Sequence, residues 1–162
     1  MSVAKSIAGL VPFWQIRKVK LVLDYGAGNM RNSLYLFRKG FRVIPVERSP
    51  HWRQYAQSQG LDYVFDPMGL PESLIVDLVL LNFVLNIIPD DLEKRKILHL
   101  VWRIIKPEGY LLVEVANNGK FMASGGEWLQ NIRRYIPNRN IRTITQIETP
   151  SSIAILFQKN QP

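Results

Sequence analysis

The chain has 162 residues, 47% of them hydrophobic and 21% charged, a composition typical of a folded globular protein. No stretch approaches the roughly 20 apolar residues of a membrane span, and the N-terminal residues lack a convincing cleavage site, so we expect a cytoplasmic protein without membrane association. The absence of cysteine excludes disulfides, thiolate metal sites and a cysteine nucleophile. Two histidines are too few for a histidine metal cluster, and we expect no metal.

The net charge is +8 at pH 7, and the excess of basic residues is shared evenly by the two halves of the chain. A positive protein surface favours anionic partners, so the charge makes nucleic acid a candidate partner. It does not identify a particular nucleic acid or a binding segment.

Helices and strands are predicted to alternate along the first half of the chain. Apolar residues recur at helical spacing over residues 2–16, interrupted by Pro12. Phe13 and Trp14 near the end of this segment are interpreted either as core residues or as a lid over a ligand. The elements that follow are a strand at 21–24, a helix at 29–39, a strand at 42–47, a helix at 51–59 and a short strand at 63–65.

The second half begins with an abbreviated crossover at 66–75 and a near-continuous apolar run at 75–81, which predicts a strand buried on both faces of a parallel sheet. Asp90 and Glu93 have the spacing of a capping box at the start of a helix that extends to about residue 105. The remaining elements are a turn at 106–109, a strand at 110–115, a helix at 127–135 and two strands at 141–148 and 153–158. This order predicts an open, mostly parallel α/β sheet that ends in an antiparallel hairpin.

The strand–turn–helix–strand unit at residues 21–47 is the most informative part of the sequence. Its turn consists of Gly26, Ala27 and Gly28, and the glycines let a ligand approach the backbone. Glu47 ends the next parallel strand, where a carboxylate can accept hydrogen bonds from two ribose hydroxyls. A dinucleotide fingerprint would have a third glycine at the position of Arg31, so a pyrophosphate is disfavoured. The unit therefore predicts a nucleoside-containing cofactor.

Residues 22–50, VLDYGAGNMRNSLYLFRKGFRVIPVERSP, resemble the first two motifs of class I S-adenosylmethionine-dependent methyltransferases. Three downstream segments resemble later motifs of that family in the same order: FDPMGLP at 65–71, DLVLLNFVLNIIP at 77–89 and RIIKPEGYLLVEV at 103–115. The likeness covers roughly residues 20–116. The chain departs from the family at Met30, where glycine is frequent, and at Pro45, which removes a hydrogen-bond donor from a strand.

The resemblance implies a Rossmann-like seven-stranded sheet with helices on both faces, and S-adenosyl-L-methionine as the cofactor. We expect one domain over residues 1–162, with an N-terminal helix or lid at 1–19, a cofactor-binding core at 20–116 and a C-terminal helix and hairpin at 117–162.

Ligands of such sheets bind at the carboxyl ends of the strands. The predicted cofactor-binding residues are Asp24, Gly26, Ala27, Gly28, Glu47, Arg48, Asp66, Pro67, Met68, Asn82 and Phe83. Asp66 is expected near the adenine amino group, and Asn82 is the predicted catalytic residue, with its carbonyl receiving a hydrogen from the attacking group. Plainer roles stay open: a cap of the glycine turn for Asp24, a pair with Arg48 or Arg53 for Glu47, a turn residue for Asp66 and a local backbone contact for Asn86.

The leading functional hypothesis is methyl transfer from S-adenosylmethionine to an acceptor that the sequence does not identify. Positioning can supply most of the rate of such a displacement, which agrees with the lack of a visible catalytic triad. One alternative is a non-catalytic subunit or scaffold that retains the fold, and another is a basic nucleic-acid-binding module. The sequence is compatible with a partner chain or with a homodimer.

Overall fold

The structure, a computed structural model, describes residues 2–117, 131–136 and 140–161. It divides into two compact units, Met1–Leu80 and Leu81–Pro162, and each unit is described by itself. Of the helix expected at 127–135, residues 127–130, Trp128 among them, lie outside the described residues, and residues 131–135 are helical.

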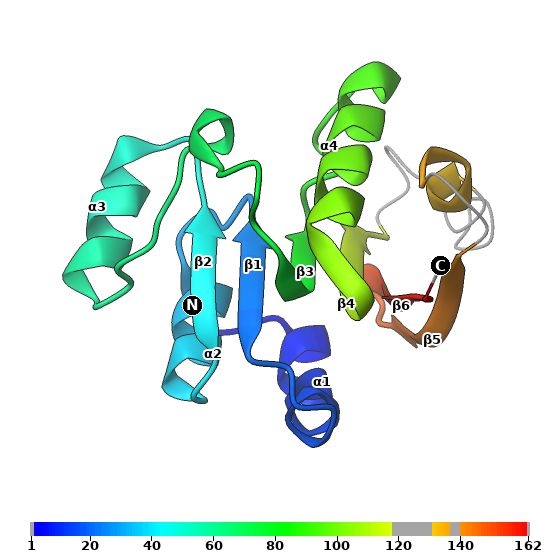
Figure 1. Cartoon of the computed structure of the whole chain (residues 1–162), viewed down its shortest axis with the longest axis horizontal. Coiled ribbons are helices and arrows are strands. Elements are labelled where there is room, and N and C mark those ends of the chain that lie inside the picture. The colour runs from blue at the N-terminus through cyan, green and yellow to red at the C-terminus, as the bar shows by residue number, and fades with distance from the viewer. Residues whose placement is uncertain (1, 118–130, 137–139, 162) are drawn as a thin grey trace. The chain divides into compact units, whose positions relative to one another are not determined.

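The first unit is built on parallel strands (Figure 1). Its strands are β1 (Leu21–Tyr25), β2 (Arg42–Val46) and β3 (Val76–Asn82), the last of which runs into the second unit. Its helices are α1 (Lys5–Ile16), α2 (Arg31–Arg38), α3 (Pro50–Ser58) and the 3-10 turn η1 (Pro67–Gly69). β1 pairs with β2 on one side and β3 on the other, so the carboxyl ends of β1 and β2 lie at one edge of the sheet.

The helix α1 contributes core residues to the first unit. Pro12 lies inside the helix and is exposed, whereas Ile7, Leu10 and Trp14 are buried. The Trp14 side chain is 0% exposed, so it is a packed core residue and not a lid.

The expected third strand at 63–65 does not form. The only pairing in this segment among the described residues is a bridge between Val46 and Phe65, in which Phe65 N–H donates to Pro45 O and Glu47 N–H donates to Phe65 O. The next bond of a parallel ladder would run from the nitrogen of residue 45 to Tyr63 O, and proline has no N–H to donate. The prediction of seven strands was therefore wrong. Within the described residues the sheet has six strands, in the order β2-β1-β3-β4-β6-β5, where β4 is Ile105–Ala116, β5 is Ile141–Glu148 and β6 is Ser152–Lys159.

The second unit contains α4 (Asp91–Ile104), β4 (Ile105–Ala116), β5 (Ile141–Glu148) and β6 (Ser152–Lys159). Asp90 is the N-cap of α4, and its carboxylate accepts from Leu92 N–H at 2.9 Å. β6 pairs antiparallel with both β4 and β5, which confirms the C-terminal hairpin. The expected turn at 106–109 is part of β4, although pairing with β6 begins only at Tyr110.

Candidate functional site

The glycine turn follows β1 and is held against the end of β2. Gly26 N–H and Ala27 N–H both donate to Val46 O, at 2.9 and 3.0 Å. Gly28 has a φ of 57°, in the left-handed region that favours glycine, and a Cβ placed there would meet nothing within 4 Å. The backbone conformation therefore favours glycine at Gly28, and the space beside it is open.

Glu47 ties the end of β2 to this turn. Its Oε2 accepts from Gly28 N–H at 2.8 Å, and its Oε1 accepts from Ser49 N–H at 2.9 Å. A carboxylate offers about four acceptor positions, so these two bonds leave others for hydroxyl donors. The side chain is half-buried, which leaves one side of it accessible.

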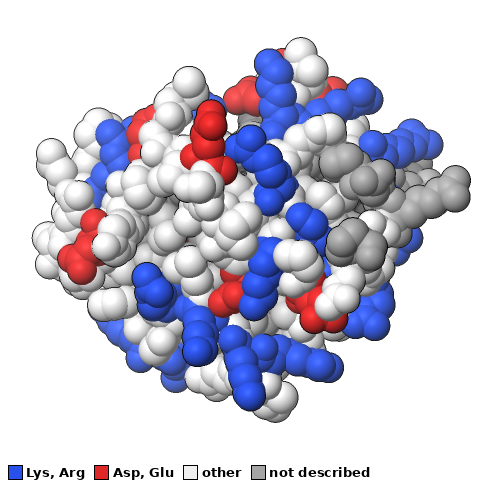
Figure 2. Space-filling view, in the orientation of Figure 1, with Lys and Arg blue, Asp and Glu red and all other residues white. Residues whose placement is uncertain are grey.

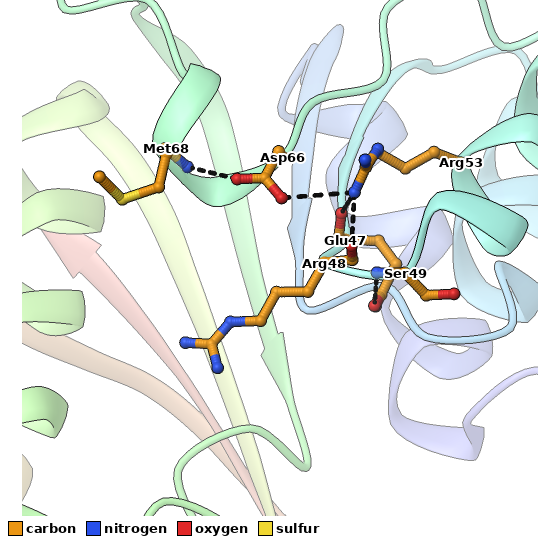
Figure 3. A network of polar contacts seen from close by, with 6 residues as sticks. All are labelled: Glu47, Arg48, Ser49, Arg53, Asp66 and Met68. Atoms are coloured by element: carbon orange, nitrogen blue, oxygen red, sulfur yellow. Dashed lines mark hydrogen bonds and ion pairs between the residues drawn. The ribbon is translucent and has the colours of Figure 1, made fainter.

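Arg53 of α3 joins Glu47 to Asp66 (Figure 3). Its Nη1 donates to the main-chain oxygens of Glu47 and Arg48, at 2.7 and 2.6 Å, and forms an ion pair with Asp66 Oδ2 at 3.3 Å. The expected alternative pairing of Glu47 with Arg53 thus involves the Glu47 carbonyl, and the Glu47 carboxylate remains turned toward the glycine turn.

Asp66 also shapes the loop that follows it. Its Oδ1 accepts from Met68 N–H at 3.0 Å, which caps η1. Asp66 therefore acts as a turn residue, which was the alternative interpretation of its place in the sequence. The Met68 side chain is 94% exposed, so the loop presents an apolar side chain to solvent beside an acidic one.

Asp24 lies at the end of β1 and is 2% exposed. Its Oδ2 accepts from Ser33 Oγ at 2.6 Å. Burial raises the pKa of Asp24 from its usual 3.8 to about 6; the Ser33 hydrogen bond opposes this rise, and the negative charge of Glu47 adds to it. β1 and β2 are parallel with Tyr25 opposite Val46, so Asp24 and Glu47 both lie at the carboxyl end of this strand pair.

The first unit thus holds nine of the eleven predicted cofactor-binding residues. The bonds described above connect Gly26, Ala27, Gly28, Glu47, Arg48, Asp66 and Met68, and Asp24 joins them through its electrostatic interaction with Glu47. Asn82 and Phe83 belong to the second unit.

Asn82 ends β3 and takes part in a buried polar cluster of the second unit. Its Nδ2 donates to Glu114 Oε2 at 2.6 Å, and Ser152 Oγ donates to Glu114 Oε1 at 2.8 Å. Phe83, with a φ of 58°, donates its N–H to Glu114 O at 2.8 Å. Asn82 Oδ1 has no hydrogen-bond partner among the described residues.

Glu114 and Ser152 were not predicted from the sequence as functional residues. A signal was present, because Glu114 is a carboxylate within the apolar run of β4 and such a residue needs buried partners. Its partners lie 32 and 38 residues away in sequence, so local patterns do not reveal them.

A family model described as a methyltransferase domain matches residues 3–161. No curated protein sequence matches the chain. A solved structure of Burkholderia thailandensis 1,6-didemethyltoxoflavin-N1-methyltransferase, with bound 1,6-didemethyltoxoflavin and S-adenosylhomocysteine, has a TM-score of 0.77 at 17% identity, over 97% of this chain and 78% of that one.

Two further solved structures show the same likeness of fold. An S-adenosylmethionine-dependent methyltransferase from Clostridium acetobutylicum has a TM-score of 0.73 at 12% identity, over 96% of this chain and 91% of that one. A SAM-dependent methyltransferase from Archaeoglobus fulgidus has a TM-score of 0.69 at 16% identity, over 95% of this chain and 93% of that one.

Proposed function

Because this chain belongs to the family of methyltransferase domains, we propose that it binds S-adenosyl-L-methionine at the carboxyl ends of β1 and β2 and transfers its methyl group to an acceptor. The observation that carries this proposal is the link between the glycine turn and Glu47, whose carboxylate is bonded to Gly28 N–H. This link places a carboxylate with spare acceptor positions beside an open, glycine-lined stretch of backbone.

The residues of the first unit fit the nucleoside part of this cofactor. Glu47 would accept hydrogen bonds from the ribose hydroxyls, and the loop of Asp66 and Met68 would take the adenine, with Asp66 toward its amino group and Met68 against the ring. The cofactor supplies a methyl group on a positively charged sulfur. Asp24, Arg48 and Pro67 complete the proposed set in the first unit. In the second unit, Asn82 and Phe83 stay predicted cofactor-binding residues, and Asn82 stays the predicted catalytic residue.

The similar structures support the choice of cofactor. The Burkholderia thailandensis enzyme is described with bound S-adenosylhomocysteine, the product of S-adenosylmethionine after methyl transfer, and the Clostridium acetobutylicum and Archaeoglobus fulgidus proteins are described as S-adenosylmethionine-dependent. At these identities the likeness concerns the fold, so the acceptor of this chain does not follow from theirs.

The cofactor is tested by thermal unfolding with S-adenosylmethionine and S-adenosylhomocysteine, with NADH as the control ligand. A ligand at about 100 times its Kd adds roughly 2.7 kcal/mol to the free energy of unfolding, or about 5–10 °C in Tm for a chain of this size. We expect this rise with the two adenosyl compounds alone. An equal change in Tm with all three ligands, or no rise in Tm at millimolar ligand, would favour the scaffold hypothesis.

The site is tested with Glu47→Gln. The amide has one acceptor oxygen where the carboxylate has two, and it loses charge-assisted bonds worth about 1.5–3 kcal/mol. We expect the Kd of S-adenosylhomocysteine, measured by calorimetry, to rise about 10–100-fold. Glu72→Gln, an exposed glutamate of the same unit, is the matched control and should leave the Kd unchanged. A wild-type Kd in Glu47→Gln would show that the cofactor assignment of Glu47 is wrong.

A further inference from the structure

A cavity of about 280 Å³ lies within the first unit, and it is lined mainly by apolar residues of β1, β2 and the segment that follows α3. Pockets that hold drug-sized ligands measure roughly 300–1,000 Å³, whereas an engineered apolar cavity of about 150 Å³ holds benzene. The cavity therefore suits a compound of one or two rings. None of its described lining residues belongs to the proposed cofactor-binding set.

The strand register explains why several lining residues share one face of β1 and β2. Leu21 is paired with Arg42, and side chains paired in a parallel sheet point to the same side, as do residues two apart along a strand. Leu21, Arg42 and Ile44 therefore lie on one face. Phe65 joins them, because it is paired with Val46, two residues after Ile44.

The cavity forms because little of the chain covers this face. Residues 66–75, all of them described, contain only the 3-10 turn η1, so this stretch supplies no α-helix to pack there. Pairing with β2 is limited to the bridge at Phe65, and Tyr63, which also lines the cavity, is 64% exposed. The remaining wall is a turn in which Leu74 N–H donates to Pro71 O at 3.2 Å.

Arg42 is the charged residue of the described lining, and its guanidinium is unused. Arg42 is exposed, and its side chain has no hydrogen-bond or ion-pair partner within residues 2–117, 131–136 and 140–161. Glu72, beside Pro71, and Asp62, beside Tyr63, are exposed and form no ion pair with it in the same ranges. A guanidinium binds a carboxylate through two parallel N–H bonds, so the cavity combines apolar walls with one cation fitted to such a group.

We propose that this cavity is a binding site for a small ring compound that carries one carboxylate. The ring packs against Ile44 and the aromatic side chains of Tyr63 and Phe65, and the carboxylate pairs with Arg42. A single negative charge is favoured because the described lining offers one cation, which would leave part of a doubly charged group unpaired. The proposal does not depend on methyl transfer, since the two sites share no described residue.

The test uses two ring compounds that differ in charge. The ¹⁵N-labelled full chain is titrated with indole-3-acetate and with indole-3-acetamide at about pH 7.5, where the acid is ionised because carboxyl groups titrate near pH 4. The amide resonances of Ile44, Tyr63 and Leu74 report binding in the cavity, and those of Gly28 and Glu47 report the cofactor end of the strands. We expect saturable shifts of the first three with a Kd of about 1 mM or lower for the acid. The amide should bind about three- to tenfold more weakly.

Two substitutions separate the charge of the site from its apolar walls. Arg42→Gln should give the acid and the amide the same Kd, because the partner of the carboxylate is lost. Arg38→Gln, at an exposed arginine of α2 in the same unit, is the matched control and should retain the wild-type preference. Leu74→Trp should fill the cavity and weaken both compounds by at least about tenfold. Arg42→Gln changes an exposed side chain, so it decides the question even if Leu74→Trp does not fold.

The proposal is overturned by equal Kd values of the two compounds for the wild-type protein, by a retained preference in Arg42→Gln, or by no saturable shift up to about 10 mM acid. Shifts at Gly28 and Glu47 in place of the cavity residues, or competition by saturating S-adenosylhomocysteine, would move the binding to the cofactor end and also overturn it. A dimer in sedimentation, with Tyr63 and Leu74 resonances that change on dilution, would show that a second copy of the chain covers the cavity instead. A protein that fails to bind S-adenosylhomocysteine contradicts only the proposed function, because the preference for the acid is measured without the cofactor.

Discussion

At the scale of single residues, folding clearly changes the pKa of the Asp24 carboxyl. Burial raises its pKa to about 6, so between about pH 4 and 6 the folded protein holds a proton that the unfolded chain releases. The contribution of Asp24 to the free energy of unfolding is therefore largest below about pH 4. It falls as the pH rises through about 6. The rise in the pKa of Asp24 by about two corresponds to about 3 kcal/mol in the free energy of unfolding. This stabilisation is fully lost above the pKa of the folded protein.

Asp24→Asn should remove this pH dependence. The amide stays neutral at every pH, and its oxygen can still accept from Ser33 Oγ. We expect the variant to be more stable than the wild type at pH 8, by up to about 3 kcal/mol, and the difference to shrink between pH 6 and 4. Urea unfolding of both proteins at a series of pH values measures it, and a difference independent of pH would contradict the assignment to Asp24.

Met30 shows why a departure from a family pattern need not weaken a turn. It has a φ of 66°, the left-handed region where glycine is frequent, and its side chain is 0% exposed. Left-handed backbone costs a non-glycine residue about 1–2 kcal/mol, whereas full burial of a methionine contributes about 1.5–3 kcal/mol. Packing thus offsets the strain, and the sequence alone could not show this because the burial depends on the fold.

At the scale of elements, Pro45 limits the width of the sheet. The register of β2 directs the main-chain groups of Arg42 and Val46 toward β1, so the missing N–H of Pro45 lies on the outer side, where it interrupts pairing with Tyr63. Tyr63, the residue opposite this gap, is 64% exposed. Pro45 therefore limits the pairing to a bridge at Phe65, and a seventh strand does not form.

Pro45→Val should extend this pairing. The new N–H can donate to Tyr63 O, a bond worth about 0.5–1.5 kcal/mol, but removal of proline frees the unfolded chain by about 0.4–1 kcal/mol. We expect little net change in stability and, in the variant, an amide at residue 45 that is protected from hydrogen exchange. Pro71→Val, an exposed proline outside the strands, is the control. An unprotected amide at residue 45 would show that something else prevents the strand.

The sequence predicted elements whose causes are local. The glycine turn, the Asp90 cap and the terminal hairpin follow from residues close together in the chain, and the structure contains all three. The prediction of a short strand at 63–65 was wrong because its pairing depends on Pro45, which lies some twenty residues away and has no N–H to donate. Glu114 was missed for the same reason, since Asn82 and Ser152 reach it only in the folded protein.

At the scale of the molecule, the net charge of +8 makes nucleic acid a candidate partner. Figure 2 shows Lys and Arg side chains spread over the face drawn, with acidic and uncharged side chains between them. No helix within the described residues is long and apolar enough to cross a bilayer. Dispersed basic side chains attract a polyanion, but they contact few phosphates at one time.

This distribution predicts weak, sequence-independent binding to nucleic acid. Each neutralised phosphate contributes about −0.9 to the slope of log K against log salt concentration for duplex DNA, so contacts with about three phosphates give a slope near −3. We expect such a slope, and similar affinities for unrelated sequences, from fluorescence anisotropy of labelled duplexes between about 50 and 200 mM salt. A slope of about −6 or steeper requires six or more phosphates held together, as in a dedicated binding surface. That result would make nucleic acid the first methyl acceptor to test.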